Sequence, residues 1–177
     1  MTGQQNGSET PSPEKQGHPI APRPNWEEYF FLITAAVSSR ASCDRATVGA
    51  IIVDPTTKRI LSTGYNGAPS GHPDCETVGH DMVEGHCLRA IHAEENSIAY
   101  AAASGVAIKN AEMYVFFHRN NSEWGKKLAE TTYPMTEFPC HPCWAMLMSV
   151  ELSVVHVLTQ SPKAGGGHTD IMVHFKR

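Results

Sequence analysis

The segment Phe-Pro-Cys-His-Pro-Cys at residues 138–143 places two cysteines three positions apart at the start of a predicted helix over 140–150. Cysteines at this spacing can form a redox pair, hold a structural metal ion, or supply part of an open catalytic metal site. At a helix N-terminus, the helix dipole and free backbone N–H groups favour the thiolates of Cys140 and Cys143. The pair alone is compatible with all three roles.

A second motif, His-Ala-Glu at residues 92–94, lies near the start of a predicted helix over 89–105. Read alone, it fits an amphipathic helix with a half-buried histidine and a solvated glutamate, and we expect Glu95 to be an exposed charge. Beside the cysteines, His92 supplies a third zinc ligand. Three protein ligands leave one position for water, whereas four close the site.

The combination of His-x-Glu with a later Pro-Cys-x-x-Cys is the signature of zinc nucleobase deaminases. It predicts a catalytic zinc ion held by His92, Cys140 and Cys143. Glu94, two residues from the histidine ligand, is then placed to shuttle protons between the bound water and a substrate. A redox role for the cysteine pair does not explain His92 and Glu94.

Predicted helices and strands alternate along the chain, which favours an α/β fold with three layers, helices on both faces of a central mixed sheet. In order they are a helix over 26–40 capped by Asn25, a hairpin of strands over 47–54 and 59–66, a long loop over 67–87, the helix over 89–105, a strand over 111–117, the helix over 140–150, a strand over 154–159, and a short apolar end after a Gly-rich turn at 165–167. Residues 1–24 are rich in Gly, Pro, Ser and Gln and are predicted to be a disordered N-terminal tail. Residues 25–177 are predicted to form one domain.

Net charge and hydropathy limit the partners and the location that we expect for the chain. A formal net charge of −4 argues against nucleic acid as a partner. No apolar run approaches the about 20 residues of a membrane helix, and no signal pattern opens the chain, so we expect no membrane partner and a cytoplasmic location. Cysteines stay reduced there, so the five cysteines and ten histidines suggest metal ions before disulfides.

Five stretches carry a family resemblance: TVGAIIVD, ILSTGYNGAPSG, HCLRAIHAEENSI, AEMYVFF and FPCHPC. Together they make the chain similar to the cytidine/deoxycytidylate deaminase superfamily, and most like the zinc-dependent dCMP deaminases of the bacterial competence-operon and phage type. The resemblance implies a cytidine-deaminase-like fold, a small pyrimidine nucleotide as partner, and a homo-oligomer. It also implies conversion of dCMP to dUMP, in which a zinc-bound hydroxide attacks C4 of the base and Glu94 transfers the protons.

The resemblance also suggests substrate contacts. Asn66 of GYNG would contact the sugar. Residues lining the base pocket would be Thr47, Val48, Gly49 and Ala50. Arg45 is a candidate phosphate partner because a guanidinium matches phosphate geometry, although a solvated surface arginine is the alternative.

A second zinc ion is implied by relatives that carry a structural zinc between the loop after GYNG and the first strand. The candidate ligands are Cys43, Cys75, His80, His86 and Cys87. The choice between His86 and Cys87 stays open. The alternative is a Gly-rich loop with free thiols.

Residues 118–137 stand before the Cys-x-x-Cys segment, where the family has the strand and the cysteines nearly adjacent. This insertion could act as a lid, an oligomer contact or a pocket wall, or be a tolerated surface insertion. Two further hypotheses for function are the same chemistry on another small substrate (a modified dCMP, a nucleoside or a free base) and an inactive zinc-stabilised binding module.

Overall fold

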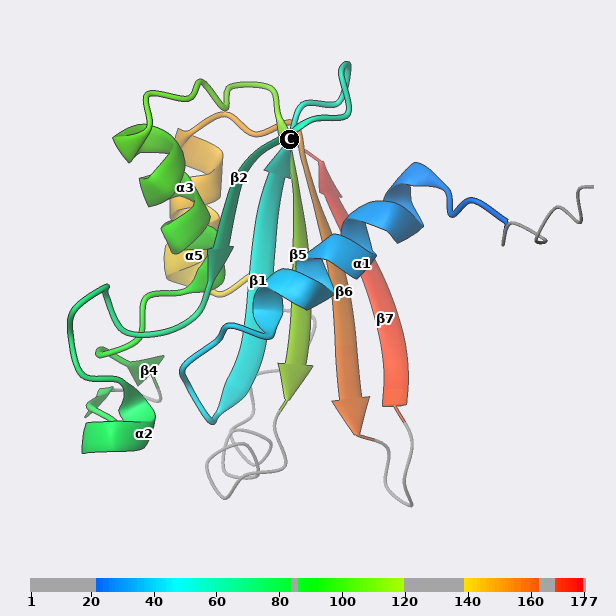
Figure 1. Ribbon diagram of the computed structural model, residues 1–177. Helices are drawn as coiled ribbons and strands as arrows, with labels where there is room; N and C mark the ends of the chain where they lie inside the picture. The colour runs from blue at the N-terminus through cyan, green and yellow to red at the C-terminus, as the bar shows by residue number, and fades with distance from the viewer. Residues whose placement is uncertain (1–21, 84–85, 120–138, 163–167, 177) are drawn as a thin grey trace, which may run out of the picture.

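The computed structural model describes residues 22–83, 86–119, 139–162 and 168–176. A five-stranded mixed sheet in the order β2-β1-β5-β6-β7 forms the middle layer. Its strands are β1 (Ala46–Val53), β2 (Ile60–Tyr65), β5 (Glu112–Arg119), β6 (Val154–Pro162) and β7 (His168–Lys176). Helix α1 (Trp26–Ser38) covers one face, and helices α3 (Ala93–Ala103) and α5 (His141–Ser149) lie together on the other (Figure 1). The predicted three-layer α/β/α fold is confirmed.

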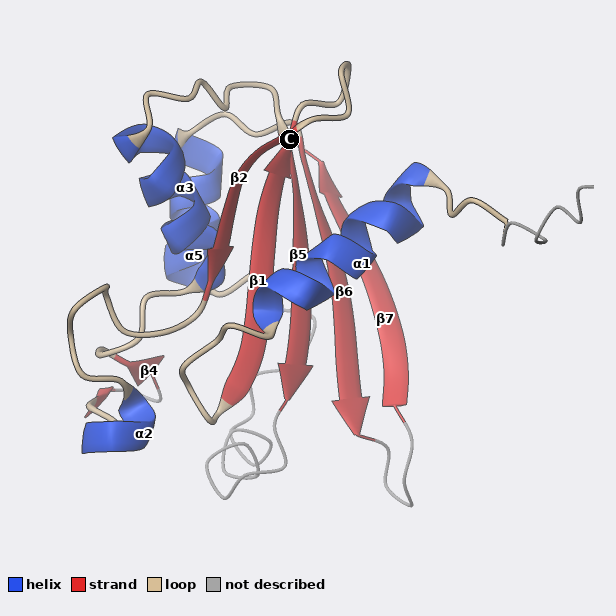
Figure 2. Cartoon of the chain, viewed as in Figure 1, coloured by secondary structure: helices blue, strands red, loops and turns tan. Residues whose placement is uncertain are grey.

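Strand pairing follows the predicted hairpin and then extends it. Strand β1 is antiparallel to both β2 and β5, β5 is parallel to β6, and β6 is antiparallel to β7 (Figure 2). For the end of the chain the sequence predicted only a short apolar segment, whereas β7 is nine residues long. The long strand forms because β6 offers an open edge whose backbone groups an antiparallel partner can satisfy over its whole length.

Alternation along β1 gives the molecule two cores. Ile51 and Val53 pack against Phe30 and Phe31 of α1. The even-numbered residues Val48, Ala50 and Ile52 of the same strand pack on the opposite face, with Ala93 of α3 and Leu147 of α5. Because side chains in a strand point alternately to the two faces, this single buried strand serves both helical layers.

The entry to α1 is fixed by the predicted cap. The Asn25 side chain accepts a hydrogen bond from the backbone N–H of Glu28 at 2.9 Å, and the Glu28 carboxylate accepts one from the Asn25 backbone at 2.9 Å. This reciprocal pair is a capping box. Close contact of α1 with β1 depends on Gly49, where an added Cβ would lie 2.4 Å from the carbonyl oxygen of Thr34.

Helix α3 begins later than predicted. The expected helix over 89–105 is observed only over Ala93–Ala103, and His92 is its N-cap residue. Residue Ile91 instead pairs with Gly67, with backbone hydrogen bonds of 2.9 and 3.1 Å. This long-range pairing uses the backbone groups that a longer helix would need, so His92 lies at the entrance of the helix.

The predicted long loop contains short elements of its own. Helix α2 (Cys75–Val78) is capped by Asp74, and strands β3 (Met82–Val83) and β4 (His86–Cys87) form a two-stranded ribbon. These elements lie beside the end of the main sheet (Figure 1). They carry Cys75, His86 and Cys87, three of the candidate ligands of the second zinc ion.

Two predictions concern residues outside the described ranges. The tail over 1–24 is described only from residue 22, and the insertion over 118–137 only at residues 118–119. Both stay predictions, as does the single domain over 25–177. Among the helices in the described ranges, none combines the length and apolar character that crossing a membrane requires.

Candidate metal centre

Two helix N-termini bring the predicted catalytic ligands together. His92 is the N-cap of α3, Cys140 is the N-cap of α5, and Cys143 lies in the first turn of α5. The Nδ1 atom of His92 lies 3.2 Å from the sulfur of each cysteine. Ligand atoms on tetrahedral zinc are roughly 3.5 Å apart for a nitrogen and a sulfur, so this donor set fits a zinc ion.

Glu95 has a role that its sequence position did not suggest. It is half-buried rather than an exposed charge, and its carboxylate accepts a hydrogen bond from the backbone N–H of His92 at 3.2 Å. The contact holds the backbone of His92 at the start of α3. The expected capping signature begins with serine or threonine, so a histidine at the N-cap conceals it.

The pKa values of Cys140 and Cys143 shift in opposite directions. A hydrogen bond from the Cys143 thiol, together with His92, lowers the pKa of Cys140 to about 4, and the same contact raises the pKa of Cys143. The hydrogen bond to Cys140 in turn raises the pKa of His92 to about 9. The cluster therefore holds a thiolate at neutral pH, which is the form of cysteine that binds metal ions.

Glu94 lies in the first turn of α3, two residues after His92. Its side chain is 2% exposed, and burial raises its pKa to about 7. A carboxyl group with such a pKa can both accept and donate a proton near neutral pH. The start of α3 thus places a candidate metal donor and a carboxyl group suited to proton transfer two residues apart.

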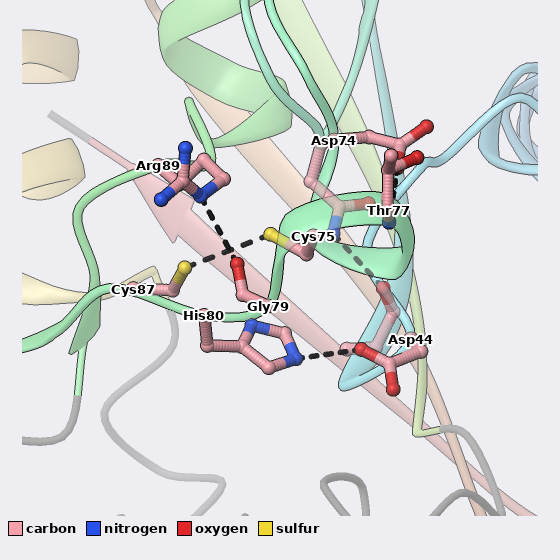
Figure 3. A network of polar contacts seen from close by, with 10 residues as sticks. Asp44, Asp74, Cys75, Thr77, Gly79, His80, Cys87 and Arg89 are labelled. Carbon is pink, nitrogen blue, oxygen red and sulfur yellow. Dashed lines mark hydrogen bonds and ion pairs between the residues drawn. The ribbon is translucent and has the colours of Figure 1, made fainter.

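A second cluster gathers around α2 and β4 (Figure 3). The donor atoms of Cys43, Cys75 and His80 all lie within 4.8 Å of one another. The sulfur of Cys87 lies 3.7 Å from the sulfur of Cys75. Two sulfurs on tetrahedral zinc are roughly 3.8 Å apart, so Cys43, Cys75 and His80 form a candidate zinc site, and Cys87 beside Cys75 is a candidate fourth donor.

Groups around this second cluster also suit a metal ion. The Nε2 atom of His80, whose side chain is 1% exposed, lies 2.7 Å from the Asp44 carboxylate (Figure 3). Histidine ligands of metal ions commonly donate their other ring N–H to a carboxylate in this way. Burial acts to raise the pKa of Cys87, but hydrogen bonds from His80 and from backbone N–H groups outweigh it and lower the pKa to about 7.

The open choice between His86 and Cys87 has a geometric answer. Cys87 is buried beside Cys75, within the second cluster. The ring of His86 instead lies near the ring of His92, with 6.2 Å between the ring centroids. The structure therefore brings Cys87 into the second cluster and leaves His86 outside it.

Asn66, the predicted sugar contact, is engaged with the backbone. Its Oδ1 accepts from the N–H of Val48 at 2.8 Å, and its Nδ2 donates to the carbonyl of Ala46 at 2.9 Å. The side chain is 7% exposed. Asn66 therefore fixes the first residues of β1, and its contact with a sugar stays a prediction.

The other predicted substrate residues divide between the faces of the sheet. Val48 and Ala50 point toward α3 and α5, where the predicted catalytic ligands lie. Alternation places Thr47 and Gly49 on the α1 face, so only their backbone remains available on the catalytic face. Arg45 is 9% exposed, so the alternative of a solvated surface arginine is wrong, and its phosphate contact stays a prediction.

The GYNG stretch positions α3. An added Cβ at Gly64 would lie 2.4 Å from the carbonyl of Ala93, so the glycine lets α3 lie directly on β2. The Asn96 side chain of α3 donates to the carbonyl of Tyr65 at 2.9 Å. These contacts fix the helix that carries Glu94.

Comparison with known proteins shows which family the chain resembles. The family model for the cytidine and deoxycytidylate deaminase zinc-binding region matches residues 24–159. The chain is 31% identical to ComE operon protein 2 of Bacillus subtilis over 134 residues, which is 76% of this chain and 59% of that protein. It is 39% identical to the deoxycytidylate deaminase of Mycobacterium phage D29 over 90 residues, which is 44% of this chain and 68% of that protein.

The fold has a counterpart among solved structures. The dCMP deaminase of cyanophage S-TIM5, solved in complex with dCMP and dUMP, aligns with a TM-score of 0.57 and 24% identity, covering 77% of this chain and 83% of that one. The family model covers the described zinc-ligand candidates of both clusters. The chain belongs to the cytidine and deoxycytidylate deaminase zinc-binding family.

Proposed function

We propose that this chain is a zinc-dependent hydrolytic deaminase that converts dCMP to dUMP. The convergence of His92, Cys140 and Cys143 beside the buried carboxyl of Glu94 carries the proposal. The names of the phage relative and of the solved cyanophage enzyme support dCMP as the substrate.

His92 Nδ1 and the two sulfurs would hold the zinc ion, and a fourth position would stay open to water. Zinc, when bound there, activates water as a nucleophile toward C4 of cytosine. The backbone contact from Glu95 holds His92, and the N-termini of α3 and α5 hold all three donors in place. The protein would thus supply a pre-formed set of ligands.

Glu94 would move the protons. It accepts a proton from water and delivers protons to N3 of the base and to the leaving amino group, so that dCMP and water give dUMP and ammonia. Its pKa of about 7 suits a group that alternates between the two protonation states. Burial, which raises this pKa, also keeps competing bulk water away from the carboxyl group.

The second cluster would bind a structural zinc ion through Cys43, Cys75, His80 and Cys87. Four protein donors leave no position for water, so this ion would have no direct part in the reaction. Its contribution would be to tie α2 and β4 to the segment before β1.

A substrate panel tests the function. Zinc-loaded protein is assayed for ammonia release from dCMP, CMP, dCTP, deoxycytidine, 5-methyl-dCMP, cytosine and guanine. We expect dCMP to react fastest, and Glu94→Gln to retain zinc while losing at least about 100-fold in turnover. The matched control is Glu76→Gln, an exposed carboxylate on α2, which should leave turnover unchanged. Absence of ammonia from dCMP would contradict the proposal.

A further inference from the structure

Strand β4 joins the two metal clusters. Its two residues have different surroundings: Cys87 is buried beside Cys75, while the ring of His86 lies beside that of His92. Successive side chains in a strand point to opposite sides, so this two-residue strand contacts both clusters. The ring centroids of His86 and His92 are 6.2 Å apart and the rings are tilted by 33°, within the range of packed aromatic pairs.

A short run of backbone contacts leads from Cys87 to His92. The carbonyl of Cys87 accepts a hydrogen bond from the N–H of Ala90 at 3.3 Å, and Ile91 then pairs with Gly67 through two hydrogen bonds. His92 follows directly as the N-cap of α3. The position of Cys87 therefore bears on the residue that holds the catalytic metal ion.

The segment around β4 has few other sources of rigidity. Helix α2 has four residues, and β3 and β4 have two each. Several of its apolar side chains are exposed, namely Val78, Met82, Val83 and Leu88. The buried cluster described here consists of Cys43, Cys75 and Cys87. Cross-linking by a metal ion, rather than an apolar core, would therefore hold β4 in place.

We propose that His86 is a positioning residue of the catalytic metal centre. The second cluster (Cys43, Cys75, His80 and Cys87) holds His86 against His92, because Cys87 directly follows His86 in β4. Packing of the His86 ring restricts rotation of the His92 ring, so that Nδ1 stays directed at the sulfurs of Cys140 and Cys143. A metal ion in the second cluster (the structural cluster) therefore tightens zinc binding at His92, Cys140 and Cys143 (the catalytic cluster). The inference rests on the proposed function, in which one cluster binds a catalytic zinc ion and the other a structural one.

Release of zinc to a coloured chelator, in the absence of substrate, tests this coupling. Cys140→Ser and Cys75→Ser identify which phase of release belongs to which cluster. We expect His86→Ala to weaken zinc binding at the catalytic cluster by about tenfold, as loss of a supporting residue does in other metal sites. His86→Phe keeps a packed ring and should restore binding to within about threefold of the unmutated protein. The exposed His72 of the same loop provides the matched control His72→Ala, which should change nothing.

The structural cluster is tested in the same assay. Cys75→Ser should weaken binding of the catalytic zinc by about tenfold. Adding His86→Ala should weaken it no further, because both changes act through the same contact between the His86 and His92 rings. Selective chelation of the structural zinc from unmutated protein gives the same comparison if Cys75→Ser does not fold.

Unchanged catalytic zinc binding in His86→Ala would overturn the role of His86. A single zinc per chain, or independent release from the two clusters, would overturn the coupling. Because no substrate is present, a protein that shows the coupling but does not deaminate dCMP would contradict the proposed function alone.

Discussion

Burial and a few close polar contacts set the protonation and orientation of the groups in both clusters. Glu94 has a pKa near 7 because it is buried, and Cys140 is a thiolate because Cys143 and His92 donate to it. At the second cluster, the carboxylate of Asp44 contacts the ring of His80 at 2.7 Å and orients it toward the thiols. These causes are local to each group, so conservative substitutions should separate their roles.

Asp44→Asn tests the orientation of His80. An amide can accept the ring N–H but lacks the negative charge, so we expect the second zinc to bind about tenfold more weakly. Chelator competition measures the change. The exposed Asp81 in the same loop offers the control Asp81→Asn, which should bind zinc normally. Equal affinity in the two variants would show that Asp44 does not support the site.

Elements are placed by close backbone contacts as much as by apolar side chains. Gly49 lets α1 lie on β1, and Gly64 lets α3 lie on β2. Also between β2 and α3, the Ser62 hydroxyl donates to the carbonyl of Ser97 at 2.7 Å. The position of Glu94 therefore depends on how closely α3 approaches the sheet.

Gly64→Ala should move α3 away from β2. The new Cβ would meet the backbone of Ala93 and Ser97 at 2.4 Å, and backbone atoms cannot give way as a flexible side chain can. We expect a loss of about 1–3 kcal/mol in the free energy of unfolding, measured by denaturant titration, together with reduced turnover. Thr63→Ala, at the exposed neighbouring position, is the control. A fully stable and active Gly64→Ala protein would contradict this role.

The sequence predicted local elements better than long-range pairing. Strand β1 and the cap at Asn25 follow from local residue patterns, and so do the N-terminal positions of His92 and Cys140. The start of α3 was misplaced because residues 89–91 suit a helix locally, while the pairing of Ile91 with Gly67 takes precedence. Asp44 was missed because its partner His80 lies 36 positions away, and no local pattern marks such a contact.

At the scale of the whole molecule, we expect the segment from α2 to β4 to depend on a metal ion for its stability. It lies beside one end of the main sheet and includes several exposed apolar side chains. A hydrogen bond links the end of α2 to the residues after β4, because the Nε of Arg89 donates to the carbonyl of Gly79 at 3.0 Å. The sheet and its two helical layers have apolar cores of their own, so we expect them to persist without metal.

Chelation should therefore expose this segment selectively. We expect trypsin to cut after Arg89 in metal-free protein at least about tenfold faster than in zinc-loaded protein, because local opening without the cross-link leaves the peptide accessible. Cleavage after the exposed Arg59, in the connection between β1 and β2, is the internal control and should not respond to metal. Mass spectrometry of the fragments identifies each cut. Equal rates at Arg89 with and without zinc would contradict a structural role for the metal ion.

Incubation of zinc-loaded protein with dCMP in ¹⁸O-labelled water tests the central claim most directly. Hydrolytic deamination predicts dUMP with one labelled oxygen at C4 and an equal amount of ammonia, with both products lost in Glu94→Gln. Absence of dUMP from protein that carries zinc at His92, Cys140 and Cys143 would contradict the proposed activity. Unlabelled dUMP would contradict attack by water.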